Sequence, residues 1–238
     1  RGLRRAGDGL RAGMTNFARG MVLLLAALAA AGCARHVNAP ELRPELPQLS
    51  FTLSEGLRYS PDDWPQALQA DLYVPNANGR FPAVLLVHGG GWERRSRDEM
   101  VSIAERLAAS GFVVMNIDYR FAPEHIFPAQ LNDLQQAMHW LHRNAEAHSI
   151  DVSRIGGFGF SSGAHLVSLL ALVAGEGGEL DQPYGGERTR LRAVVAGGTP
   201  TDLSKYGGGN LVPQFLGGTR EAVPERFALA SPVSHVHS

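Results

Sequence analysis

The chain has 238 residues, a formal net charge of −1 and 44% hydrophobic residues. This balance excludes a highly charged disordered tail and a basic surface for nucleic acid. The length suits one α/β domain or two small ones, and it easily supports a hydrophobic core. Cys33 is the only cysteine, which excludes an intramolecular disulfide and a thiolate zinc site.

The first 33 residues have the character of a leader segment. Arg19 precedes an apolar run over residues 22–31 that is too short to span a bilayer as a stable helix. Small residues then stand directly before Cys33. This arrangement resembles a bacterial lipoprotein signal, although Ala30 stands where leucine is usual. It implies a lipid on Cys33 as the only membrane contact, on the periplasmic or outer side. A plain secretory signal or a core cysteine is the alternative.

Residues 34–50 are polar and contain Pro40, Pro44 and Pro47, a composition typical of a tether. We therefore expect three parts along the chain. They are a leader with a signal peptide over residues 1–33, a tether over residues 34–50 and one folded domain over residues 51–238.

From about residue 66, short apolar runs alternate with longer helical patterns, which predicts an α/β fold with a parallel sheet between helices. Strands are expected at residues 68–74, 83–87, 112–117, 155–160 and 193–196. Helices are expected over residues 100–107, from Pro128 onward, and over residues 162–174. Right-handed crossovers give a doubly wound, mostly parallel sheet with its ligand crevice at the carboxyl ends of the strands.

Gly159-Phe160-Ser161-Ser162-Gly163 matches the Gly-x-Ser-x-Gly pattern of a nucleophile elbow. Such an elbow turns sharply from a strand into a helix and pushes the serine hydroxyl into the crevice. The flanking glycines avoid clashes in that turn. The strand predicted before Ser161 and the buried helix predicted after it favour this interpretation. For the motif alone, a turn serine that caps the helix is the alternative.

A second motif, His88-Gly89-Gly90-Gly91-Trp92, directly follows the strand that ends at Val87. Backbone N–H groups aimed at one point stabilise the oxyanion of acyl transfer, and a glycine run lets the backbone approach a substrate closely. A glycine-rich turn without a binding role is the alternative. A phosphate loop is disfavoured because no Gly-x-x-x-x-Gly-Lys-Ser/Thr stretch is present.

From about residue 66 onward the chain resembles the hormone-sensitive-lipase-like and feruloyl-esterase-like carboxylesterases of the α/β-hydrolase superfamily. Four landmarks in order carry this resemblance: residues 88–92, 118–129, 159–166 and 230–233. It implies the α/β-hydrolase fold, with Ser161 as the nucleophile. The N–H groups of Gly90, Gly91 and Ser162 would form the oxyanion hole, and His88, Gly89 and Trp92 would support the loop.

The same resemblance implies a small-molecule ester as the substrate, either a short acyl ester or an esterified carbohydrate. The reaction would pass through an acyl-enzyme intermediate without a metal or another cofactor. The chain departs from many relatives at Phe160, where Glu or Asp is frequent, and at Ala164, where glycine is frequent. The apolar Phe160 leaves catalysis possible but changes the polarity of the pocket.

Four other candidate side chains have structural interpretations. His165 is expected to be packed and hydrogen-bonded on the buried helix, facing away from Ser161 Oγ. Asp118 is expected to fix a loop through Arg120, and Asp133 is expected to be structural. Asp202 is expected to shape the wall of the pocket.

Hydrolases of this group order their triad as serine, then acid, then histidine. In relatives the acid follows one further strand after the Ser-Pro-Val motif, here Ser231 to Val233. The sequence therefore predicts a domain that lacks its last strands, with the acid and the histidine beyond Ser238. We expect neither His235 nor His237 to contact Ser161 Oγ or to bind a metal, and we expect this fragment to be inactive by itself.

Two other functions remain open at this point. One is amide hydrolysis of the arylformamidase or peptidase type, and the other is a non-catalytic binding module with a hydrolase fold. The sequence predicts neither the acyl and alcohol specificity nor the oligomeric state. Residues 205–224 are a candidate lid.

Overall fold

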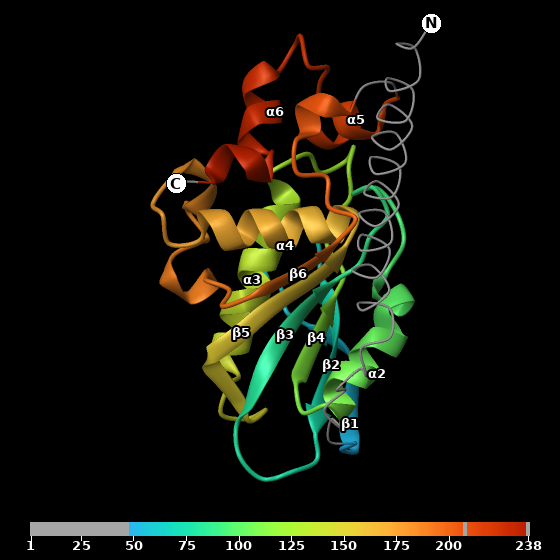
Figure 1. Cartoon of the computed structure of the whole chain (residues 1–238), viewed down its shortest axis with the longest axis vertical. Coiled ribbons are helices and arrows are strands. Elements are labelled where there is room, and N and C mark those ends of the chain that lie inside the picture. Colours follow the sequence, from blue (N-terminus) through green and yellow to red (C-terminus); the bar gives the residue numbers. More distant parts are fainter. Residues whose placement is uncertain (1–47, 207–208, 237–238) are drawn as a thin grey trace, which may run out of the picture. The chain divides into compact units, whose positions relative to one another are not determined.

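The structure is a computed structural model that describes residues 48–206 and 209–236. The leader, Cys33 and nearly all of the expected tether lie outside the described residues. In the described ranges, six strands form one sheet in the order β1-β2-β4-β3-β5-β6 (Figure 1). The strands are β1 (Phe51–Arg58), β2 (Gln69–Pro75), β3 (Phe81–Val87), β4 (Val113–Ile117), β5 (Ile150–Phe160) and β6 (Val194–Gly197).

The sheet is mixed, with its parallel part next to the crevice. Strand β3 pairs in parallel with both β4 and β5, and β5 pairs in parallel with β6. Strand β2 runs antiparallel to both β1 and β4. The fold class predicted from the sequence is therefore confirmed as a mostly parallel α/β sheet.

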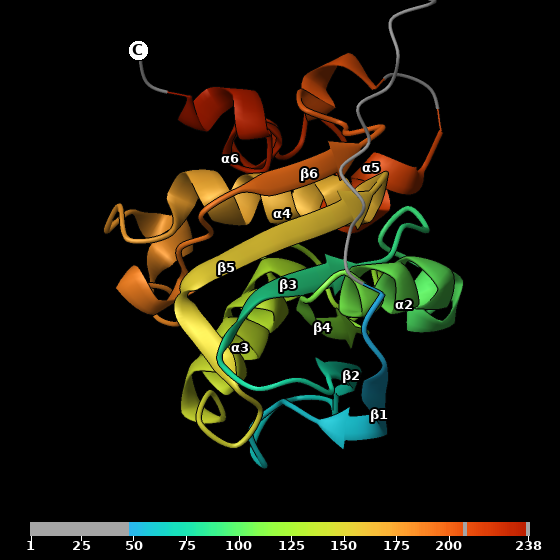
Figure 2. The same cartoon turned by 60° about the horizontal axis from the view of Figure 1, so that its bottom comes forward.

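Helices α2 (Val101–Ala109), α3 (Ala129–Arg143) and α4 (Ser162–Val173) cover the two faces of this sheet (Figure 2). The short helices α5 (Leu211–Leu216) and α6 (Pro224–Leu229) lie beyond the carboxyl ends of the strands (Figure 1). Helix α2 packs on one face through a small core that includes Met100, Ala104 and Leu86. The larger core lies with α3 and α4 on the other face and includes Leu85, Leu134 and Leu166. Most residues of helix α4 are buried, as expected for a helix that is apolar almost all round.

Four elements differ from the sequence-based expectation. Strand β1 and the short helices α5 and α6 were not predicted, and β5 begins at Ile150 rather than near residue 155. The other expected strands and helices are present within a few residues of their predicted bounds. No helix in residues 48–206 and 209–236 is long and apolar enough to cross a membrane.

The parallel register brings two motifs to one edge of the sheet. Val87, the last residue of β3, is in register with Gly159 near the end of β5. The glycine run that follows Val87 and the serine that follows Phe160 therefore emerge at the same edge, at the carboxyl ends of their strands.

Candidate active site

Ser161 occupies a tight turn between β5 and α4. Its backbone has φ 53° and ψ −117°, which is rare for a residue with a side chain. Two hydrogen bonds hold this turn: the Ser161 N–H donates to Gly197 O at 2.7 Å, and the His165 N–H donates to Ser161 O at 3.0 Å. The serine is thus fixed from the β6 side and from the first turn of the helix.

The two flanking glycines are required by close backbone approach. A Cβ atom at Gly159 would lie 2.4 Å from the carbonyl group of Gly163. A Cβ atom at Gly163 would lie 2.2 Å from Val87 O and 2.5 Å from His88 O. No side chain fits at either position, so the helix packs directly on the end of β3. This explains the Gly-x-Ser-x-Gly spacing in physical terms.

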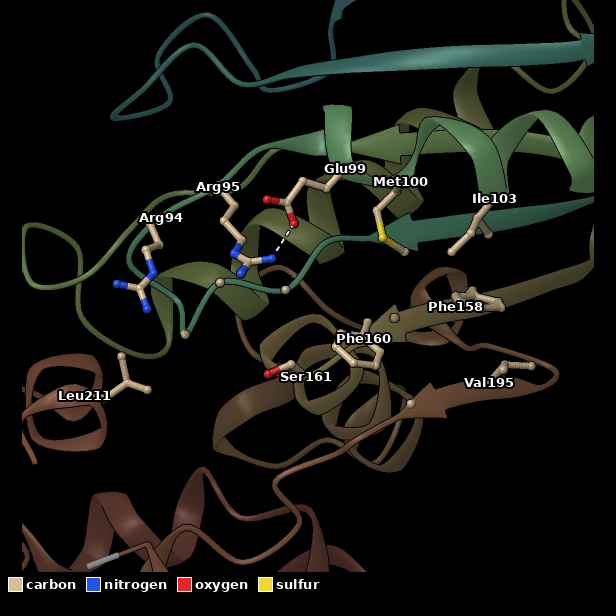
Figure 3. A pocket seen from close by; sticks show the side chains of 15 residues that line it. Arg94, Arg95, Glu99, Met100, Ile103, Phe158, Phe160, Ser161, Val195 and Leu211 are labelled. Atoms are coloured by element: carbon tan, nitrogen blue, oxygen red, sulfur yellow. Dashed lines mark hydrogen bonds and ion pairs between the residues drawn. The ribbon is translucent and has the colours of Figure 1, made fainter. Parts of the chain in front are cut away.

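The glycine run lies beside Ser161. A Cβ atom at Gly89 would be 3.4 Å from Ser161 Cβ. Gly90 and Gly91 have φ values of 119° and 65°, a backbone conformation that glycine adopts readily. Together these residues line a cleft of about 540 Å³ (Figure 3). The structure therefore brings the two sequence motifs together in one cavity.

The backbone N–H groups of this region are available to a ligand. No backbone carbonyl in the described part of the chain accepts a hydrogen bond from the N–H of Gly90 or Gly91. Ser162 is the first residue of α4, and an N–H at that position has no partner within the helix. The Ser162 side chain points into the protein, where its Oγ lies 3.3 Å from the Tyr119 hydroxyl.

The buried side chain of His88 holds the glycine run through a hydrogen bond to its first residue, Gly89. Its Nδ1 lies 2.6 Å from Gly89 O, so Nδ1 carries the proton and donates. The ring stacks on Tyr119 with centroids 4.5 Å apart, and the Tyr119 hydroxyl donates to His88 O at 3.2 Å. Burial lowers the pKa of His88, which keeps the imidazole neutral.

Trp92 anchors the other end of the run. The buried indole stacks on Phe215 of α5, with ring centroids 4.4 Å apart. Its N–H donates to Nδ1 of His165 at 3.2 Å. The other nitrogen of His165 lies 2.7 Å from Ala230 O and donates to it. Burial lowers the pKa of His165 to about 4. The expectation that His165 is packed and hydrogen-bonded is confirmed.

Two expectations about carboxylates are wrong. Asp118 binds Arg97 instead of Arg120, accepting from its backbone N–H at 2.9 Å and from its guanidinium. Arg120 instead forms an ion pair of 2.7 Å with Asp133, whose structural role is confirmed. Asp118 and Arg120 are close together along the chain, but each forms its ion pair with a different partner.

Asp202 does not line the cleft, contrary to the sequence-based expectation. Its carboxylate caps a 3₁₀ turn over Leu203–Lys205 by accepting from Ser204 N at 3.1 Å. A second contact, from the Ser204 hydroxyl at 2.5 Å, completes this local turn. The Asp202 carboxylate therefore caps its own turn and does not contribute to the pocket wall.

Several residues that line the cleft were not found from the sequence. The charged ones are Arg94, Arg95 and Glu99. The apolar ones are Met100, Ile103, Phe158, Val195 and Leu211. Phe160 lines the cleft too and is 58% exposed. Only the position of Arg94 and Arg95, three and four residues after Gly91, gave a signal that they belong to the site.

No histidine in the described ranges forms a hydrogen bond with Ser161 Oγ. His235 is bound elsewhere, with Nε2 at 2.8 Å from Leu229 O. His237 lies outside the described residues. The part of the chain that the structure describes also contains no group of three or more His, Cys, Asp or Glu side chains able to hold a metal ion.

Comparison with known families decides the classification. The sequence profile of the BD-FAE family matches residues 70–238, which includes both motifs of the cleft. The chain belongs to the BD-FAE family. Together with the esterase relatives and solved structures that follow, this match confirms the resemblance to carboxylesterases of the α/β-hydrolase superfamily.

Relatives of this BD-FAE chain include two mycobacterial proteins. Carboxylesterase NlhH from Mycobacterium tuberculosis is 34% identical over 139 residues, which are 57% of this chain and 41% of that protein. Esterase LipC from the same species is 35% identical over 115 residues, which are 48% of this chain and 28% of that protein. The chain thus spans less than half the length of these curated relatives.

Solved structures show the same fold. A truncated form of a carbohydrate esterase from gut microbiota matches with a TM-score of 0.68 and 26% identity, over 81% of this chain and 75% of that one. Esterase B from Lactobacillus rhamnosis matches with a TM-score of 0.64 and 24% identity, over 92% of this chain and 71% of that one. The α/β-hydrolase fold of the BD-FAE chain is therefore shared with solved esterases.

Proposed function

We propose that this BD-FAE protein is a serine hydrolase that cleaves carboxylic esters. The observation that carries the proposal is the strained backbone of Ser161, held beside three consecutive glycines in one cleft. Backbone strain of this kind persists only where the surrounding structure enforces it, and it is frequent at active sites. The similarity to carboxylesterase NlhH and to esterase LipC supports ester cleavage.

In the proposed reaction, Ser161 Oγ attacks the carbonyl carbon of the ester. The carbonyl oxygen becomes an oxyanion that accepts hydrogen bonds from the N–H groups of Gly90, Gly91 and Ser162. Such preorganised donors stabilise the transition state more than the substrate. The tetrahedral intermediate then expels the alcohol and leaves an acyl-enzyme, which water hydrolyses. A general base takes the Ser161 proton and returns it to the leaving alcohol, and we propose that this base lies outside the described residues.

Substrates of two kinds fit this proposal. Short acyl esters suit a cleft of about 540 Å³ whose walls are largely apolar. Esterified carbohydrates are suggested by the carbohydrate esterase whose structure is similar. Neither class requires a metal or an organic cofactor for the step at Ser161.

The test uses the full-length protein with p-nitrophenyl acetate and its Ser161→Ala variant. We expect Ser161→Ala to lose nearly all turnover, because the nucleophile and its partners act as a unit. Mass spectrometry after treatment with a phosphonate ester should find the adduct on Ser161. Equal hydrolysis by both proteins would contradict the proposal. Faster cleavage of the matched p-nitroanilide would indicate an amide hydrolase instead.

We also propose that Cys33 is lipidated and holds the protein on a bacterial membrane, facing the periplasm or the exterior. The support is the sequence alone: an apolar run over residues 22–31 and small residues before a single cysteine. Mass spectrometry of the expressed full-length protein is expected to find a lipid on an N-terminal Cys33. A mature protein that begins elsewhere without a lipid would contradict this proposal.

A further inference from the structure

Two arginines follow the glycine run and reach the cleft of Ser161. Arg94 and Arg95 line it together with one carboxylate, that of Glu99, and the remaining lining residues are glycine, Ser161 or apolar. The charged lining groups are therefore two guanidinium groups and one carboxylate, and Glu93, the partner of Arg94, lies beside them. These charged groups lie next to the expected position of the scissile carbonyl group.

The backbone of Arg95 is held in a conformation that favours glycine. Its φ is 79°, in the left-handed region where a side chain is rare. The stem of Arg95 lies on the glycine run: its Cδ is 3.1 Å from where a Cβ of Gly90 would stand. The carbonyl oxygen of Arg94 would be 2.1 Å from that same Cβ. An arginine kept in such a position over a proposed oxyanion donor indicates a function for the side chain.

Both guanidinium groups keep donors free for a ligand. Arg95 contacts Glu99 at 2.6 Å, and its side chain is 53% exposed. Arg94 contacts Glu93 at 3.2 Å, and its side chain is 68% exposed. A guanidinium has five N–H donors, and exposed ion pairs of this kind are weak. A carboxylate of a substrate can therefore bind without displacing a strong internal contact.

One end of the cleft carries both arginines together with Leu211, and the other end is apolar. In the view of Figure 3, Arg94 and Arg95 lie toward one end, Ile103 and Val195 lie toward the other, and Ser161 lies between them. An ester whose carbonyl carbon is at Ser161 extends in both directions. Its charged part is accommodated at the arginines and its apolar part at the opposite end.

We propose that Arg94 and Arg95 form a subsite for a carboxylate of the substrate. The inference rests on the proposed function and narrows it to esters that carry a carboxylate a few bonds from the ester carbonyl, such as half-esters of short dicarboxylic acids. Planar guanidinium groups match carboxylate geometry, and hydrogen bonds between charged partners are shorter and stronger than those between neutral ones.

The experiment compares two esters with the same leaving group in the full-length protein. They are 4-nitrophenyl hydrogen succinate and 4-nitrophenyl butyrate, of similar length and different charge. The double variant Arg94→Gln/Arg95→Gly should lower the succinate-to-butyrate ratio of kcat/KM about tenfold, chiefly through a higher KM for the succinate ester. Arg106→Gln is the matched control, because Arg106 is an exposed residue of α2 that does not line the cleft. Added salt should reduce the same ratio in the wild type.

An unchanged ratio in the double variant would overturn the subsite. An equal loss with both esters would overturn it too, since that result would mean a damaged glycine loop. If neither ester is cleaved above the Ser161→Ala background, the proposed function fails, and binding then tests the subsite by itself. Calorimetry with monomethyl succinate and the Ser161→Ala protein should then show about tenfold weaker binding when Arg94→Gln and Arg95→Gly are added. Equal binding would overturn the subsite.

Discussion

The indole N–H of Trp92 donates a hydrogen bond to Nδ1 of His165, with the two nitrogens 3.2 Å apart. Trp92 ends the glycine run, and His165 belongs to the first turn of the helix that follows Ser161. The bond therefore ties the proposed oxyanion donors to the nucleophile. It also fixes the tautomer of His165, because Nδ1 must accept while Nε2 donates to Ala230 O at 2.7 Å.

The buried, neutral imidazole of His165 predicts that the stability of the fold depends on pH. Burial lowers its pKa from 6.5 to about 4, so the unfolded chain binds a proton in a range where the folded protein does not. The contribution of the neutral imidazole is complete above pH 6.5 and declines as the pH falls toward 4. The loss amounts to about 1.4 kcal/mol per pH unit within that window. Denaturant unfolding between pH 4 and 7.5 measures it.

The His165→Gln variant provides the comparison, because glutamine does not titrate. It is expected to be less stable at pH 7 but to lose less stability on acidification than the wild type. Other carboxylates titrate in both proteins, so the difference between the two curves isolates His165. Parallel curves would contradict the assigned role.

The contact between α4 and the end of β3 predicts that alanine destabilises the protein far more at Gly163 than at Gly178. In Gly163→Ala, the new methyl group would lie 2.2 Å from Val87 O, so the elbow must move. We expect a loss of at least about 2 kcal/mol, typical of an overpacked core. Gly178→Ala is the control, because nothing lies within 4 Å of its Cβ position. Similar melting temperatures for the two variants would show that the elbow tolerates the displacement.

The ion pair of Arg120 and Asp133 predicts that substitutions at the two residues change the free energy of unfolding non-additively. Both side chains are buried, and Asp133 also accepts from Trp64 Nε1 at 2.8 Å. Arg120→Met leaves a buried carboxylate without its cation and should cost about 3–5 kcal/mol. Adding Asp133→Leu should restore part of that loss, since an apolar pair avoids the desolvation of both charges. Urea unfolding of the single and double variants checks this, and simple additivity would contradict it.

The site was predictable from the sequence where its parts are adjacent in the chain. The elbow and the glycine run are continuous motifs, and each follows a strand that the sequence predicts. Their meeting follows from the parallel register of β3 and β5. The pairing of Arg97 with Asp118 was not predictable in this way. It joins two loops that the sheet brings together, and the nearer Arg120 was the simpler partner along the chain.

Strand β1 was missed for a different reason. Its sequence, Phe-Thr-Leu-Ser-Glu-Gly-Leu-Arg, is mostly polar, and all of its residues are partly or fully exposed. It is an edge strand with an irregular register between Ser54 and Leu57, and Gly56 there has φ 65°. Local periodicity is weak at such a bulge, so pairing with β2 determines the strand and propensity does not.

Relative to alanine, glycine is expected to stabilise the protein at Ser161 and to destabilise it at the adjacent Ser162. Ser161 has φ 53° and ψ −117°, which any residue with a Cβ atom adopts only under strain of about 1–3 kcal/mol. Ser161→Gly should therefore be more stable than Ser161→Ala by about 1 kcal/mol, after the entropy that glycine adds to the unfolded chain.

Ser162 is the first residue of α4, where helical geometry favours alanine. Ser162→Gly should consequently be less stable than Ser162→Ala, by up to about 1 kcal/mol. All four variants lack the hydroxyl of the substituted serine, so its loss cancels within each pair. Thermal unfolding at pH 7 measures both differences. The same sign at both positions would show that the backbone of Ser161 is relaxed, and the strain would then give no support to its role as the nucleophile.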